Sequence, residues 1–90
     1  MSEDKLEHAI NRGLKARELL ENELLQEAFA KYEADCVSKM LTTGPLEKDI
    51  REKLYLAINV ARKVKDHLSK LVADGKLAQT ELRMRLFKPL

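Results

Sequence analysis

The longest regular pattern of apolar residues lies between two breaks in the chain, at residues 42–45 and 73–76. Apolar residues recur there in alternating steps of four and three, which places them along one face of a helix. The members of this seam are Ile50, Leu54, Ala57, Ala61, Val64, Leu68 and Leu71. Leu56, Ile58 and Val60 widen the apolar surface beside it. The pattern predicts a helix over 45–73 that is covered from more than one side, because one neighbouring helix covers only one stripe.

Three further segments show helical spacing. A second apolar stripe predicts a helix over 23–41, and its members are Leu25, Phe29, Tyr32, Cys36 and Met40. An earlier helix is expected over 4–20 and a short one over 77–86. No run of alternating β-branched residues predicts a strand. The expected fold is all-α, with residues 1–90 forming a single helical domain.

The boundaries of these helices follow from glycine, proline and asparagine. Gly44 can end a helix in the left-handed conformation, and Pro45 suits the first position of the next helix. Gly75 is expected to act as a C-terminal stop. Asn22 is a suitable N-cap, so the chain can bend back there. The alternative, one helix that continues through Glu21 and Asn22, remains open at this stage.

The charge pattern favours an antiparallel helical hairpin. Residues 18–35 carry six acids and one base, a net charge of −5, whereas residues 59–70 carry four bases and one acid, a net charge of +3. A chain that folds back at residues 44–45 brings together positions whose numbers sum to about 88. The acidic Glu21 and Glu27 then face the basic Arg62, Lys63 and Lys65, and opposite charges favour this pairing.

Composition points to self-association. A chain of 90 residues buries only about 60–65% of its unfolded surface, so its core is thin unless another subunit adds to it. We therefore expect a homodimer or a higher homo-oligomer that forms a helical bundle. The balance of 17 Lys and Arg against 15 Asp and Glu is nearly neutral and argues against a dedicated nucleic-acid binder.

The sequence predicts no catalytic, metal or cofactor site. Cys36 is the only cysteine, which precludes an intramolecular disulfide and fits a reducing compartment. Its place on an apolar stripe favours a buried thiol over a reactive nucleophile. His8 and His67 have no partner at the spacing of a metal site, and the three glycines are isolated, so no phosphate-binding loop is expected. We therefore expect that the protein is not an enzyme.

The sequence also bears on the location of the protein and on the contacts of its C-terminal segment. Neither a signal peptide nor an apolar run of about 18 residues is present, so we expect a cytoplasmic protein without a membrane span. The basic residues Arg83, Arg85 and Lys88 alternate with apolar ones near the C-terminus. This segment can contact a partner or nucleic acid, or pack against its own fold or a second subunit.

Two stretches of the chain carry a family resemblance. They are residues 16–29, which include Ala-Arg-Glu-Leu-Leu-Glu-Asn and Leu-Gln-Glu-Ala-Phe, and residues 51–78, which end in Gly-Lys-Leu-Ala. They resemble the short, mostly uncharacterised helical proteins encoded by tailed bacteriophages and prophages. In that family the asparagine is often followed by proline, whereas this chain has Glu23.

The resemblance implies a virion-assembly or accessory role in the host cytoplasm, with a phage or host protein as a possible partner. The function expected first is a non-catalytic protein–protein interaction or assembly module. The alternative is a small nucleic-acid-associated accessory protein, such as a DNA-packaging or regulatory subunit.

Overall fold

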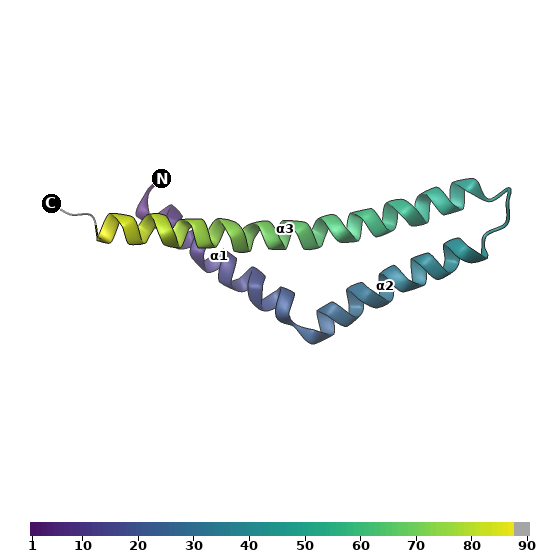
Figure 1. The fold of residues 1–90 in the computed structure, drawn as a ribbon, viewed down its shortest axis with the longest axis horizontal. Coiled ribbons are helices and arrows are strands. Elements are labelled where there is room, and N and C mark those ends of the chain that lie inside the picture. The colour runs from purple at the N-terminus through teal and green to yellow at the C-terminus, as the bar shows by residue number, and fades with distance from the viewer. Residues whose placement is uncertain (88–90) are drawn as a thin grey trace. The chain divides into compact units, whose positions relative to one another are not determined.

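The chain folds into three α-helices. The structure is a computed structural model that describes residues 1–87, and within them the helices are α1 (Glu3–Glu21), α2 (Glu23–Thr42) and α3 (Lys48–Leu86), shown in Figure 1. Their lengths are 19, 20 and 39 residues, and no strand occurs between residues 1 and 87. The prediction of an all-α fold is confirmed.

Contacts between residues divide the chain into two compact units. The first unit contains α1 and the part of α3 from Asp66 onward, and the second contains residues 22–65, with α2 and the first part of α3. In the first unit the buried apolar residues are Leu6, Ala16 and Ala78. In the second unit they are Cys36 and Ile58. Each unit therefore has only a small core.

Asn22 separates α1 from α2. Its backbone is extended, with φ −70° and ψ 117°, and its side-chain Oδ1 accepts a hydrogen bond of 2.9 Å from the Leu25 N–H. An asparagine in this position satisfies one of the free N–H groups at the start of a helix. Of the two alternatives, a cap at Asn22 is correct, and a helix that continues through this residue is wrong.

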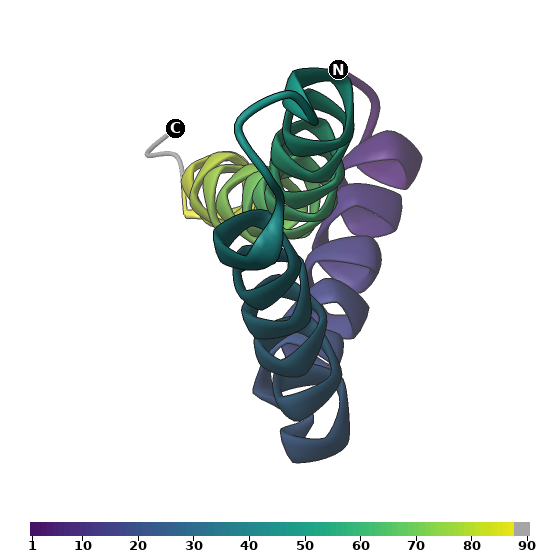
Figure 2. The ribbon, with the colours of Figure 1, turned by 90° about the vertical axis from the view of Figure 1, so that its right-hand side faces the viewer.

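The loop between α2 and α3, drawn in teal in Figure 2, differs in detail from the prediction. Thr43 ends α2 with an extended backbone, and its N–H and hydroxyl both donate to the Met40 carbonyl. Gly44 has no positive φ, because Thr43 already provides the cap. The next helix begins at Lys48 and not at Pro45. Arg51 holds the loop by donating to the Thr43 hydroxyl and, at 2.6 Å, to the Gly44 carbonyl.

The predicted stop at Gly75 is wrong, and α3 continues without a break to Leu86. Gly75 lies against Gly13 of α1, within the first unit. A Cβ atom at position 13 would lie 2.9 Å from the Leu71 carbonyl oxygen and 3.0 Å from the Gly75 Cα. A Cβ atom at position 75 would lie 3.1 Å from the Ala9 carbonyl oxygen. The two glycines therefore let the backbones of α1 and α3 approach closely, and this contact explains a glycine inside a long helix.

Between residues 1 and 87, the side-chain ion pairs within single helices are exposed. Of the acid–base pairs spaced for mutual contact within a helix, Glu81 and Arg85 pair at 2.8 Å, in the favourable order with the acid first. Arg17 and Glu21 pair at 2.9 Å in the opposite order. All four side chains are at least a third exposed, and such pairs contribute little stability. Packing of apolar faces therefore has to provide most of the stability of these helices.

Candidate functional site

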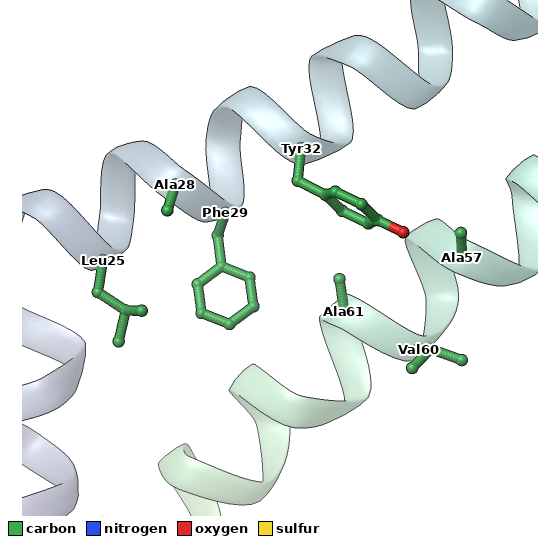
Figure 3. Close-up of a pocket in the computed structure, with 7 residues that line it drawn as sticks. All are labelled: Leu25, Ala28, Phe29, Tyr32, Ala57, Val60 and Ala61. Atoms are coloured by element: carbon green, nitrogen blue, oxygen red, sulfur yellow. The ribbon is translucent and has the colours of Figure 1, made fainter.

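An apolar cavity opens between α2 and the first part of α3, within the second unit (Figure 3). Its volume is about 490 Å³. The residues that line it are Leu25, Ala28, Phe29, Tyr32, Ala57, Val60 and Ala61. None of them carries a charge, and the Tyr32 hydroxyl is the one polar side-chain group among them. This cavity is the candidate functional site.

Helical spacing places these residues in two facing rows. On α2, Leu25, Phe29 and Tyr32 follow one another at steps of four and three, starting from the turn that Asn22 caps. On α3 the facing positions 57 and 61 are both alanine, one turn apart. Figure 3 shows Phe29 and Tyr32 pointing from α2 toward these alanines. Because alanine fills little of the space between the helices, the cavity remains open.

Two charged contacts cross the second unit beside the cavity. Arg62 of α3 donates a hydrogen bond to the Glu33 carboxylate of α2. That hydrogen bond lowers the pKa of Glu33, desolvation of the carboxylate opposes it, and the positive charges of Arg62 and Lys65 lower the pKa further. The Lys65 ammonium lies 5.7 Å from the centre of the Phe29 ring, within range of a cation–π interaction. These contacts join α2 to α3 while leaving the cavity apolar.

An exposed apolar row borders the cavity on α3. Leu56, Val60 and Val64 follow one another at steps of four, and their exposed fractions are 59%, 61% and 50%. Val60 also lines the cavity, so the row and the cavity form one surface. We call these three residues the α3 row. A continuous exposed apolar surface of this kind is typical of a binding site for another macromolecule.

The structure divides the predicted core residues into three groups. Cys36 and Ile58 are buried, and the Cys36 thiol is free. Leu25, Phe29, Met40, Leu54, Ala57 and Ala61 are half-buried in the second unit. Tyr32, Ile50 and Val64 are about half exposed, so they form no closed core within this chain.

The last two residues of the predicted seam lie in the first unit and not in the second. Leu68 and Leu71 lie in the first unit, where they line a smaller cavity together with Ala16 and Leu19 of α1. The predicted seam is therefore divided between the two units. The cause is the helix boundary at Asn22, because α1 and α2 contact different parts of α3.

The predicted register of charges is also wrong. Arg62 was expected to face the region of Glu27, but it pairs with Glu33, about two helical turns further along α2. Lys65 lies over Phe29, and its charge acts on Glu33 and not on Glu27. Glu21 belongs to the first unit and not to the second. The expected pairing assumed a simple reversal at residues 44–45, whereas α2 ends at Thr42 and α3 begins at Lys48.

Ala28 and Val60 both line the cavity. Val60 was expected only to widen the apolar surface beside the seam, and Ala28 was not among the candidate residues. A signal for Val60 was present, because it lies three residues after Ala57 and beside the seam. Gly75 was expected to end a helix, and no packing role was expected for Gly13. A glycine within an otherwise helical pattern often marks a close packing contact, and that signal could have identified them.

The remaining candidate residues are two histidines and three basic residues near the C-terminus. His8 and His67 are exposed, and residues 1–87 contain no group of three metal-ligating side chains. In the C-terminal segment, Arg83 is exposed and Arg85 pairs with Glu81, while Lys88 lies outside the described residues. Within the described part of the chain, no helix has the length and apolar character needed to cross a membrane.

Comparison of the chain with protein-family models, with curated proteins and with solved structures gave no match. Function is therefore inferred from the geometry of the chain itself.

Proposed function

We propose that the chain is a non-catalytic helical module that binds a protein helix at the apolar cavity of its second unit. The observation that carries this proposal is the lining of the cavity, which has no charged side chain. A site for a small polar substrate needs several convergent polar groups, and a catalytic site needs titratable ones. An apolar surface without them suits the apolar face of a helix.

The antiparallel arrangement of α2 and α3 in a helical hairpin is part of this proposal. Two contacts support it: Phe29 of α2 contacts Lys65 of α3, and Glu33 contacts Arg62. From the first contact to the second, the residue number increases along α2 and decreases along α3, as it does between antiparallel helices. Two antiparallel helices present a groove along their length. Leu25, Ala28 and Tyr32 on one side and the α3 row on the other provide apolar positions at helical spacing. An amphipathic helix binds such a groove through residues at its own positions i, i+3 or i+4, and i+7.

The biological setting is inferred from the resemblance of residues 16–29 and 51–78 to short phage-encoded helical proteins. It suggests that the partner belongs to virion assembly or to the host cytoplasm. This part of the proposal rests on the resemblance alone.

Site-specific photo-crosslinking in the cell that naturally expresses the protein tests the binding site. Val60 is replaced by a photoreactive phenylalanine in the full chain, and Val37 is replaced in the same way as a control. Val37 is also an exposed valine, at 41%, but it does not line the cavity. We expect a protein adduct at position 60 and none at position 37. Equal labelling at both positions, or none at position 60, would contradict the proposal.

A further inference from the structure

We propose that the partner at this site is a second copy of the chain, whose own α3 row (Leu56, Val60 and Val64) enters the cavity. This inference rests on the proposed function and names its partner. Three features of the second unit support it: the adjacency of row and cavity, the size of the side chains, and the distribution of charge.

The row and the cavity lie next to each other, and Val60 belongs to both. A two-fold symmetric contact uses the same patch on both subunits, so the patch must carry both the protruding and the receiving surface. Here one face of the second unit carries both. A single contact would therefore fill two cavities and cover two exposed rows.

The side chains of the α3 row are of a size that suits the alanine-lined cavity. The cavity is open because three of the residues that line it, Ala28, Ala57 and Ala61, have the small side chain of alanine. The row that would enter it consists of one leucine and two valines, which are compact and have no polar atoms. Apolar side chains of this size fill gaps above alanines in packed helices without burying a polar group. No aromatic ring would have to be inserted.

The charges on the two helices are opposite. Helix α2 carries four acids and two bases, a net charge of −2, whereas residues 48–65 of α3 carry six bases and two acids, a net charge of +4. One ion pair, between Glu33 and Arg62, joins these segments within the described residues. Glu27, Lys53 and Lys63 remain exposed. A second copy would place α3 of one subunit beside α2 of the other, so each exposed charge set would meet its opposite.

Sedimentation equilibrium of the purified full chain at micromolar concentration tests the inference. We expect the wild-type protein at twice the chain mass of 10.3 kDa. Val60→Gln should weaken the dimer about 100-fold, because each subunit loses one buried valine and each loss is worth about tenfold. The matched control Val37→Gln should leave the dimer unchanged. Both valines are exposed within the chain, so circular dichroism should show unchanged helix content. If Val60→Gln loses helix content, Val64→Gln replaces it.

A charge-reversal series adds a second readout. Reversing Glu27 and Asp35 of α2 to lysine should weaken the dimer about 3- to 10-fold, because exposed ion pairs are individually weak. Reversing Lys53 and Lys63 to glutamate in the same chain should restore part of the affinity, since the two helices again carry opposite charges. Absence of any rescue would remove the charge argument and with it this orientation of the copies.

The outcomes separate this inference from the proposed function. A wild-type protein that stays at 10.3 kDa, while position 60 still crosslinks to a different protein, overturns the second copy as partner and leaves the binding site intact. A dimer that is insensitive to Val60→Gln and Val64→Gln uses another surface and also overturns the inference. Loss of every adduct at position 60 overturns the proposed function itself.

Discussion

Replacing Gly13 by alanine sets two opposing effects against each other. Alanine favours a helix over glycine by about 0.8–1.0 kcal/mol, so at an open position in α1 the change would stabilise the protein. At position 13, however, the new methyl group would lie 2.9 Å from the Leu71 carbonyl oxygen and 3.0 Å from the Gly75 Cα. Both neighbours are backbone atoms, which cannot rotate away as a flexible side chain could.

The packing effect should be the larger of the two. Inserting a methyl group into a tightly packed contact typically costs about 1–3 kcal/mol, because backbones or neighbouring side chains must shift. With the gain in helix propensity subtracted, we expect Gly13→Ala to lower the free energy of unfolding by about 0–2 kcal/mol. Gly75→Ala should cost less, about 0–1 kcal/mol, because its nearest contacts are 3.1 Å. The double variant should cost less than the sum, since the first alanine already separates the helices.

Urea denaturation followed by circular dichroism measures these differences. Ala73→Gly provides the calibration. Ala73 is exposed in α3, the helix that contains Gly75, so this change measures the helix preference of alanine over glycine without a close contact. It should destabilise the protein by about 1 kcal/mol. A Gly13→Ala variant that is more stable than the wild type by a similar amount would refute the close approach of α1 and α3.

Three further predictions concern the second unit. Phe29→Ala should lower the free energy of unfolding by about 2 kcal/mol, less than the 3–5 kcal/mol of a fully buried ring, because Phe29 is half-buried beside the cavity; chemical denaturation checks this value. Asn22→Ala should cost about 1 kcal/mol in the same assay through loss of the N-cap, and Asn22→Gly only a few tenths. Arg62→Gln should raise the pKa of Glu33 toward its ordinary value in an NMR titration. Because the folded-state pKa of Glu33 is lowered, the stabilisation by this pair is present at neutral pH and is lost as the pH falls through that pKa.

Local signals predicted the helices and one of their boundaries. The apolar spacing of α2 identified Cys36 as a core residue, and it is buried. Asn22 was recognised as a possible cap, because its short polar side chain can reach the free N–H groups of the next turn. The sequence left the alternative of a continuous helix open, since Glu23 is also compatible with helix. The hydrogen bond to Leu25 decides between them.

Features that depend on contacts between helices were predicted poorly. Gly75 looked like a stop because glycine is the weakest helix former after proline, but its contact with Gly13 outweighs that preference. The pairing of Glu33 with Arg62 is shifted by about two helical turns from the pairing expected for a simple reversal of the chain at residues 44–45. The cavity could not be predicted, because it depends on how far apart Phe29 and the alanines of α3 are held.

The position of α1 in the sequence has a consequence for the order in which the chain folds. Within the second unit, the Glu33–Arg62 contact closes a segment of 29 residues. The contact of Gly13 with Gly75 closes a segment about twice as long, which contains the whole second unit. Each doubling of a flexible loop adds about 0.6 kcal/mol to the entropic cost of closure, and prior formation of the second unit shortens the loop that remains. We therefore expect α1 to dock last during folding and to detach first during partial unfolding, which would show as the fastest hydrogen exchange among the helical amides.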